Sequence, residues 1–288
     1  MEVKDQEGAE KKKTGRSKKK VRCLFVLALL LFFICWIVSW IPVTERIELD
    51  LLPGDASDLR LVLLTDLHSC YYGPEQKWLL DRVDREKPDI ILLGGDFFDD
   101  EIPDDNSRIT AEALVKKYPC YYVTGNHEFW SGRAEEMKEY LRSIGVHVLA
   151  GDCESIRIND CSLDICGVDD PTDIGISEWT AQLDSAFSQT DPSHLRILLT
   201  HRPEKVGEYE NYDFDLILAG HAHGGQFLIP GLNRGLLAPD QGFMAEYVNG
   251  TYELQNGSLL EVSRGLGRES TPLPRFFDHP EVVVLDIR

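Results

Sequence analysis

The sequence predicts an α/β domain of two packed β-sheets flanked by helices, with one transmembrane helix before it. Three observations support this expectation. Short apolar runs typical of buried strands alternate with helical stretches in the first half of the chain. From residue 146 onward the pattern becomes rich in hairpins and strands. An uncharged stretch of 21 residues near the N-terminus is long enough to cross a bilayer.

The expected elements follow one another as strand, helix, strand. Buried strands are expected at residues 59–64, 90–93, 120–123, 195–199 and 216–219, and an alternating, turn-rich C-terminal part ends with residues 282–287. Helices are expected at residues 75–86, 110–117, 133–143 and 177–187, the first of them ended by Pro88. The steps Asn249-Gly250 and Asn256-Gly257 are hairpin signals in the C-terminal part. With 288 residues, the chain has room for one large domain with a substantial core.

The uncharged stretch, residues 23–43, reads CLFVLALLLFFICWIVSWIPV. At about 1.5 Å per residue it covers roughly 30 Å, the thickness of a hydrocarbon core. Trp36 and Trp40 lie toward its far end, where interfacial aromatic residues are common. Basic residues directly precede it, so the positive-inside rule places the N-terminus in the cytoplasm and the rest of the chain outside.

Two other interpretations of this stretch agree less well with its sequence. A buried core helix would show a polar face, and none is present. A signal peptide has a shorter apolar region and a small-residue cleavage site, for which Val38-Ser39-Trp40 is a poor match. The expected organisation is a basic cytoplasmic tail (1–22), a transmembrane anchor (23–43), a linker (44–57) and an extracytoplasmic domain (58–288).

The charge of the chain is unevenly distributed. Residues 1–22 carry nine Lys/Arg and four Asp/Glu, a net charge of +5, so the remainder carries −24 of the overall −19. An acidic body of this size repels nucleic-acid backbones and anionic lipid surfaces. We therefore expect no nucleic-acid partner.

Five short polar segments follow the predicted strands and hold five of the eight histidines. They are Asp66-Leu67-His68, Gly95-Asp96-Phe97-Phe98-Asp99, Gly125-Asn126-His127-Glu128, His201 and Gly220-His221-Ala222-His223. Side chains at the ends of adjacent strands converge on one point. Asp, Asn and His suit Mn²⁺, Fe or Zn²⁺ more than Ca²⁺. Two such ions about 3.5–4 Å apart can clamp a phosphate, so the pattern indicates a two-metal phosphoester hydrolase.

This set of motifs resembles the calcineurin-like metallophosphoesterase superfamily over roughly residues 58–288. The segments 220–226 and 263–267, together with the anchor, resemble its bacterial membrane-associated YkuE/YaeI-type branch. The resemblance implies a four-layer α/β/β/α sandwich, which agrees with the pattern above. It also implies two divalent ions. One would be held by Asp66, His68 and His223, the other by Asn126, His201 and His221, with Asp96 bridging them.

The resemblance also implies the catalytic pair. His127 would be the general acid that protonates the leaving oxygen, and Asp99 would orient it and favour its protonated form. One departure concerns the second motif: the protein serine/threonine phosphatases of this superfamily carry Asp-Arg-Gly there, whereas Asp99 is followed by Asp100-Glu101. The missing arginine argues against that phosphoprotein branch. For Arg264, a substrate-phosphate contact and a structural salt bridge are equally plausible.

Two cysteines predict a disulfide. If Asn159-Asp160 is a two-residue hairpin loop, Cys153 faces Cys166 in a non-hydrogen-bonded pair. We hypothesise that these two thiols are linked. No thiol cluster in the sequence has zinc spacing.

The expected function is a membrane-anchored, manganese-preferring phosphoesterase. A phosphodiester or pyrophosphate substrate is favoured over a protein phosphate, and the anchor suggests a lipid-linked or cell-envelope substrate. The alternatives are a broad extracytoplasmic phosphomonoesterase and a non-catalytic scaffold. Scaffolds with this fold usually lose ligands, whereas this chain keeps all seven together with His127 and Asp99.

Overall fold

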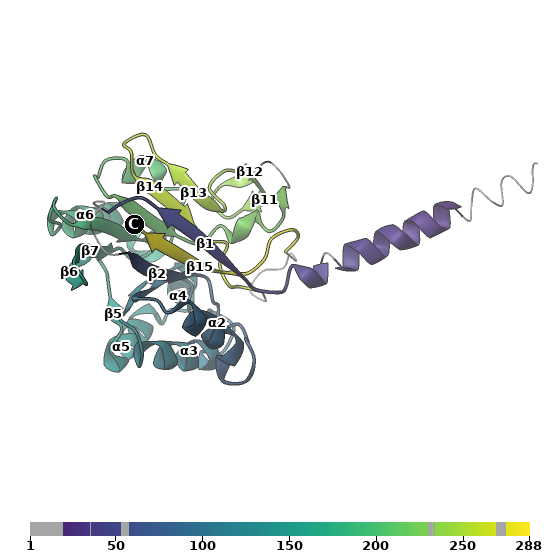
Figure 1. The fold of residues 1–288 in the computed structure, drawn as a ribbon, viewed down its shortest axis with the longest axis horizontal. Coiled ribbons are helices and arrows are strands. Elements are labelled where there is room, and N and C mark those ends of the chain that lie inside the picture. The colour runs from purple at the N-terminus through teal and green to yellow at the C-terminus, as the bar shows by residue number, and fades with distance from the viewer. Residues whose placement is uncertain (1–19, 35, 53–57, 230–231, 233, 269–274) are drawn as a thin grey trace, which may run out of the picture.

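The computed structural model describes residues 20–34, 36–52, 58–229, 232, 234–268 and 275–288. Most of the expected basic tail and part of the expected linker lie outside these residues. Within them, two six-stranded sheets face each other, and helices cover their outer sides (Figure 1). The four-layer α/β/β/α arrangement is therefore confirmed.

The first sheet has the order β1-β15-β2-β3-β4-β5. Its strands are β1 (Val43–Leu49), β15 (Glu281–Ile287), β2 (Leu59–Leu64), β3 (Ile90–Gly94), β4 (Cys120–Val123) and β5 (His147–Val148). Strands β2 to β5 run parallel, while β15 runs antiparallel to β2. Helices α2 (Lys77–Glu86), α3 (Asp105–Val115) and α5 (Ala134–Ile144) cover its outer face.

The second sheet has the order β13-β14-β9-β8-β7-β6. Its strands are β13 (Gly250–Glu253), β14 (Leu259–Val262), β9 (Leu216–Ala219), β8 (Leu195–Leu199), β7 (Cys161–Gly167) and β6 (Asp152–Ile158). Helices α6 (Pro171–Ser188) and α7 (Val206–Tyr209) pack on its outer side. A third, small sheet consists of β10 (Leu228–Ile229), β11 (Arg234–Ala238) and β12 (Gly242–Ala245).

Alternation along the buried strands explains the layers. Leu61 and Leu63 of β2 belong to the core between the two sheets, whereas Val62 and Leu64 pack toward the helices. Successive side chains of a strand point to opposite faces, so a strand that is apolar at every position must be covered on both. This is why the sequence shows continuous apolar runs rather than alternation with polar residues.

The expected linker (44–57) needs correction at its start. Val43–Leu49 forms β1, an edge strand that pairs in parallel with β15. Its charged residues Glu45, Arg46 and Glu48 obscured it, because charges are common on edge strands, where one side of the strand has no partner. The expected anchor helix therefore joins the sheet almost directly.

Two helices begin earlier than expected. Helix α6 starts at Pro171, six residues before the expected start, because Asp170 caps it by accepting a hydrogen bond from the Thr172 amide (2.8 Å). Gly175 interrupts it with a φ of 78°, which hid the first turn from a periodicity argument. Helix α3 starts at Asp105 rather than at residue 110, through a polar first turn.

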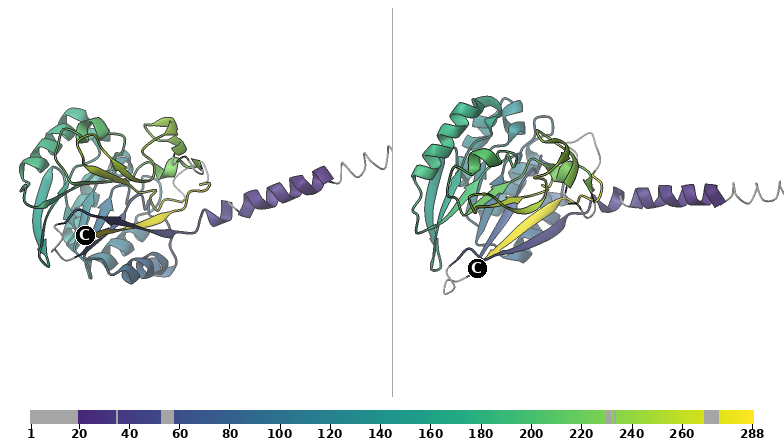
Figure 2. Two further views of the ribbon diagram at one scale, coloured as in Figure 1. Left: turned by 45° about the horizontal axis from the view of Figure 1, so that its top comes forward. Right: turned by 90° about the horizontal axis from the view of Figure 1, so that it is seen from above.

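The predicted disulfide is confirmed. Cys153 and Cys166 are opposite each other in the β6–β7 register and are linked. The helix expected to cross a membrane is also present: Lys20–Val38 is long and apolar enough to do so, and none of its most apolar stretch is buried in the protein. It projects from the domain (Figures 1 and 2).

Candidate metal centre

The candidate ligands lie where strands of both sheets end. Asp66 and His68 follow β2, and Asp96 follows β3. Asn126 opens the short helix α4 (Asn126–Trp130) after β4. The remaining three follow β8 and β9 in the facing sheet: His201, His221 and His223. Because parallel strands end at one edge, the two halves of the domain bring these side chains together.

The backbone at these positions is unusual. Five of the seven predicted ligands have positive φ angles: Asp66 (51°), His68 (47°), Asp96 (46°), His221 (64°) and His223 (45°). Left-handed backbone is unfavourable for residues with a Cβ, and such strain clusters at functional sites. Here all five of these residues belong to the ligand clusters at the strand ends.

Two glycines permit the close approach of the loops. A Cβ on Gly125 would collide with the carboxylate of Asp96, and one on Gly220 would collide with that of Asp66. Glycine is therefore required at these two positions for the carboxylates to lie where they do.

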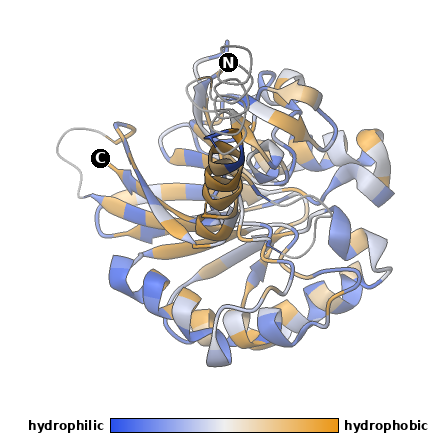
Figure 3. Cartoon of the chain, turned by 90° about the vertical axis from the view of Figure 1, so that its right-hand side faces the viewer, coloured by the Kyte–Doolittle hydropathy of each residue, from blue (hydrophilic) through white to orange (hydrophobic). Residues whose placement is uncertain are grey.

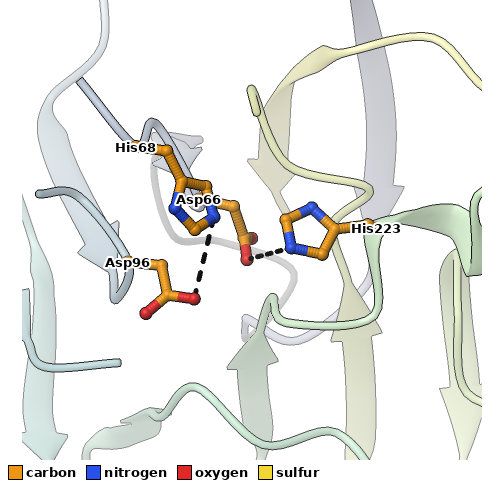
Figure 4. Close-up of side chains that lie close together, drawn as sticks. All are labelled: Asp66, His68, Asp96 and His223. Carbon is orange, nitrogen blue, oxygen red and sulfur yellow. Dashed lines mark ion pairs between the residues drawn. The ribbon is translucent and has the colours of Figure 1, made fainter. Parts of the chain in front are cut away.

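The first group of candidate ligands comprises Asp66, His68, Asp96 and His223, all buried, with ligand atoms within 4.8 Å of one another. Figure 4 shows the four side chains pointing toward a common space. His68 Nε2 lies 3.7 Å from Asp96 Oδ2, and His223 Nε2 lies 3.6 Å from Asp66 Oδ1. These separations are longer than hydrogen bonds but suit atoms that share one ion.

The second group comprises Asp96, His201 and His221, which are also buried and within 4.8 Å of one another. His201 Nε2 lies 3.1 Å from Asp96 Oδ2, and its Nδ1 donates to the Gly94 carbonyl (2.9 Å). Asp96 thus belongs to both groups. The position of its carboxylate is the one expected of a bridging ligand.

Buried polar atoms without hydrogen-bond partners test whether ions fit here. His68 Nε2, Asn126 Oδ1 and His221 Nδ1 are buried and make no hydrogen bond, and the buried His201 Nε2 and Asp96 Oδ2 make none beyond their mutual ion pair at 3.1 Å. Leaving such atoms unsatisfied is unfavourable, and their concentration at one point calls for a shared partner. All five are nitrogen or oxygen atoms able to ligate a divalent metal, so the residues fit a dinuclear centre.

His127 and Asp99 lie beside the first group. His68 Nδ1 is 2.9 Å from Asp99 Oδ2, whereas His127 Nδ1 is 3.4 Å from that oxygen and 2.6 Å from Asp100 Oδ1. Asp99 therefore supports the ring of His68 as well as that of His127. Asp100, which the sequence analysis considered only as a departure from another branch, is the closer partner of His127.

Neighbouring charges and burial shift the pKa values of His127 and Asp99 in opposite directions. Burial disfavours the protonated His127 ring, but the hydrogen bond with Asp99 and the charges of Asp96, Asp99 and Asp100 raise its pKa to about 9. Burial also opposes ionisation of Asp99, yet hydrogen bonds from His127 and His68 hold its pKa well below the usual value. These carboxylates therefore favour the protonated form of His127, which can donate a proton.

Glu128 fixes the loops around the site. Its buried carboxylate accepts hydrogen bonds from the amides of Gly125 (2.7 Å), Phe98 (2.9 Å) and Asp96 (3.1 Å). It thereby connects the loop after β4 to the loop after β3. Its bond to the Gly125 amide also caps the start of α4, because it satisfies the amide of the residue before the helix.

Sequence reasoning missed the groups that hold His221. Its Nε2 lies 3.0 Å from Asp240 Oδ2, in the turn between β11 and β12, and 2.8 Å from Nη1 of the buried Arg202, which itself forms ion pairs with both Asp240 and Asp170. Because both groups contact Nε2, they orient the ring and leave Nδ1, which makes no hydrogen bond, facing the candidate centre. Asp240 is 19 residues from His221, and no local pattern connects the two.

Arg264 and Arg275 lie behind His223. Arg264 forms a buried ion pair with Glu281, which corresponds to the structural alternative for this residue. Arg275 is paired with Asp278 (3.0 Å), and its Nη2 lies 3.4 Å from His223 Nδ1. Both guanidinium groups thus have structural partners close to the site.

The family model named Calcineurin-like phosphoesterase matches residues 59–225, more than half of the chain. The chain belongs to this family. The match contains every candidate ligand and both candidate catalytic residues. A metal-dependent phosphoesterase domain is the family's common property, and the clustered ligands of this chain are consistent with a dinuclear site.

Curated relatives support this assignment. An uncharacterized metallophosphoesterase of Helicobacter pylori is 28% identical over 232 residues, covering 79% of this chain and 59% of that protein. The uncharacterized metallophosphoesterase YkuE of Bacillus subtilis is 28% identical over 258 residues, covering 86% of each. The similarity to YkuE agrees with the branch expected from the sequence.

A third relative bears on the membrane. A bovine protein named transmembrane protein with metallophosphoesterase domain is 27% identical over 249 residues, covering 80% of this chain and 53% of that protein. This chain thus spans little more than half the length of the Helicobacter and bovine relatives. It shares with the bovine protein a metallophosphoesterase domain, and its described residues include one helix that is long and apolar enough to cross a membrane.

Proposed function

We propose that this chain is a membrane-anchored phosphoesterase with two divalent ions, for which manganese is the expected metal. The observation that supports it most strongly is the position of Asp96, whose carboxylate lies in both ligand groups. Asp66, His68 and His223 would complete one ion's ligands, and Asn126, His201 and His221 the other's. When bound, the two ions would neutralise phosphate charge and activate water.

In this proposal the chain's own residues supply orientation and a proton. His127 donates the proton to the leaving oxygen, and Asp99 and Asp100 hold its ring and keep it protonated. Asp99 also fixes the ring of His68 through Nδ1, so that Nε2 faces the ligand group. One carboxylate thus couples the acid to the metal centre.

For the substrate we propose a phosphodiester or pyrophosphate of a lipid-linked or cell-envelope compound. The helix Lys20–Val38 would cross the membrane with the N-terminus in the cytoplasm and the domain outside, in accord with the basic residues before it. Only four residues separate this helix from β1, so the site stays near the bilayer.

The test is hydrolysis of bis-(p-nitrophenyl) phosphate and p-nitrophenyl phosphate by the full chain in lipid nanodiscs, with and without Mn²⁺. The proposal predicts manganese-stimulated cleavage of the diester, with loss in Asn126→Ala and His127→Ala variants. Cleavage of the monoester alone would favour the phosphomonoesterase. No turnover with two ions bound would favour the scaffold.

A further inference from the structure

The anchor enters the fold at the edge that carries the candidate metal centre. Val43, the first residue of β1, is opposite Glu281, the first residue of β15. Strand β15 is antiparallel to β2, and Val283 is opposite Leu63, so the start of β15 lies at the end of β2. The chain thus leaves the anchor helix beside the strand end that is followed by Asp66.

The junction between anchor and domain is short and hydrogen-bonded. Residues 39–42 connect the helix to β1. The Val43 amide donates to the Pro280 carbonyl (2.9 Å), and His279 Nδ1 lies 3.1 Å from the Ile41 carbonyl oxygen, to which it donates. The domain is therefore held close to the end of the helix rather than tethered at a distance.

A contact between two aromatic rings shows that the domain packs alongside the anchor helix and not only at its end. The rings of Phe32 and Phe276 have centroids 4.7 Å apart, and Phe276 stacks in turn on Phe227 (5.9 Å). Phe32 is six residues before Val38, which is about 9 Å along the helix axis. If the helix spans the bilayer, Phe276 lies at the level of the lipid chains.

A cavity continues this contact. It measures about 480 Å³ and is lined by anchor residues Ala28, Leu31 and Phe32 and by domain residues Phe227, Phe276 and Phe277. All of its lining residues are apolar. An open apolar space between a membrane helix and its domain is more compatible with lipid than with water.

Next to it lies an exposed set of large apolar side chains, which we term the apolar ridge. Its members and their exposed fractions are Leu232 (60%), Leu236 (39%), Leu237 (46%), Phe243 (72%) and Phe277 (46%). Leu237 and Phe243 are paired across β11 and β12. Leu236 and Leu237 are consecutive yet both exposed, so the hairpin projects from the domain. The ridge connects to the anchor contact because the Leu236 amide donates to the Phe227 carbonyl (2.9 Å).

We propose that the apolar ridge is a second membrane-contacting surface that inserts into the lipid interface beside the anchor. This rests on the proposed anchoring and goes beyond it, because it fixes how the domain faces the bilayer. The charges on this hairpin are paired: Arg234 and Glu246 form an ion pair with each other (3.3 Å), and Asp240 in the turn forms one with Arg202. Figure 3 views the molecule from the side of the apolar anchor helix.

The ridge and the metal centre share one hairpin. The turn between β11 and β12 carries Asp240, which supports His221, while the strands carry Leu237 and Phe243. Lipid contact at the strands would hold this turn in place. The candidate centre would then face phosphoesters at the level of the lipid headgroups.

Photo-cross-linking of the full chain in lipid nanodiscs tests the proposal. Phe243→p-benzoylphenylalanine and Leu237→p-benzoylphenylalanine are the test variants, at exposed positions that tolerate a larger ring. Phe25→p-benzoylphenylalanine, in the anchor (64% exposed), is the positive control. The negative control is Lys116→p-benzoylphenylalanine. Lys116 is exposed and lies before the start of β4, at the ends of the strands away from the candidate centre.

The proposal predicts lipid adducts by mass spectrometry at positions 243, 237 and 25, at least tenfold more abundant than at 116. Adducts at 25 but none at 243 and 237 would overturn it while leaving the anchor intact. Adducts of 243 with a second copy of the chain would overturn it in favour of a protein interface. Absence of adducts at 25 would contradict the anchoring itself, and the ridge proposal with it.

Discussion

Three of the four histidines of the candidate centre are held in two different ways. His68 and His201 are supported by groups inside the domain, the Asp99 carboxylate and the Gly94 carbonyl. His221 is supported by the buried Arg202 and by Asp240, whose side chain is 57% exposed in the turn of a projecting hairpin. The first pair is thus fixed by the core, whereas His221 depends in part on a surface element. We infer that the two ions differ in how firmly they are held.

Removing the Asp96 carboxylate should affect both ions equally, because Asp96 belongs to both ligand groups. In an Asp96→Ala variant we expect both ions to be lost and kcat/KM to fall by about a thousandfold or more, the loss of several kcal/mol of transition-state stabilisation. Elemental analysis and diester hydrolysis are the measurements. An Asp213→Ala variant, at an exposed aspartate, is the control. Retention of two ions by Asp96→Ala would contradict the bridging role.

Asp240 distinguishes the two ions. An Asp240→Asn variant removes the charge behind His221, and we expect the affinity for the second ion to fall by about 10- to 100-fold, with the first ion retained. Metal titration followed by activity is the measurement. An Asp99→Asn variant should instead weaken the first ion, through His68. If Asp240→Asn lowered the affinity for both ions equally, the inference that the two ions are held with different firmness would be wrong.

The acid beside the first group sets a pH dependence. His127, with a pKa raised to about 9, is active when protonated, so activity falls as the pH rises through that value. Asp100→Asn removes one of the charges that raise this pKa. We expect the alkaline limb of kcat to move down by about one pH unit, most clearly for a substrate with a poor leaving group. An unchanged pH profile of kcat would mean that Asp100 does not influence proton donation by His127.

The smallest effect on activity is expected from removing the disulfide, which includes no candidate ligand of either ion. The Cys153–Cys166 bond closes a short loop in β6 and β7. A Cys153→Ser/Cys166→Ser variant should lose about 2–3 kcal/mol of unfolding free energy, because the unfolded chain regains freedom. Its diester hydrolysis should stay within about twofold. Denaturant titration measures the unfolding free energy, and hydrolysis of bis-(p-nitrophenyl) phosphate measures the activity. A large loss of activity would mean that this hairpin influences the metal centre.

The sequence predicted the inner layers of the fold well, for physical reasons. Strands buried on both faces must be apolar throughout, so β2, β3, β4, β8 and β9 were visible as apolar runs. The ligands were predictable because they follow these strands directly. Strand β1 was not, since its charged residues and edge position resemble a linker.

The supports of the site were less predictable than the ligands. Asp240 and Arg202 meet at His221 only because a hairpin of the small sheet folds back over the second sheet. Asp100 was visible in the sequence, but its proximity to His127 depends on the geometry of the loop after β3. Such long-range contacts leave no periodic pattern. The apolar ridge was likewise hidden, because exposure cannot be read from short strands.

The most direct test of the central claim is electron paramagnetic resonance of the full chain loaded with Mn²⁺ in nanodiscs, together with elemental analysis. We predict two ions per chain and the spectrum of an exchange-coupled pair, as expected for two ions about 3.5–4 Å apart. The Asp96→Ala variant should lose this signal. One ion per chain with the spectrum of isolated Mn²⁺ would contradict the shared role of Asp96.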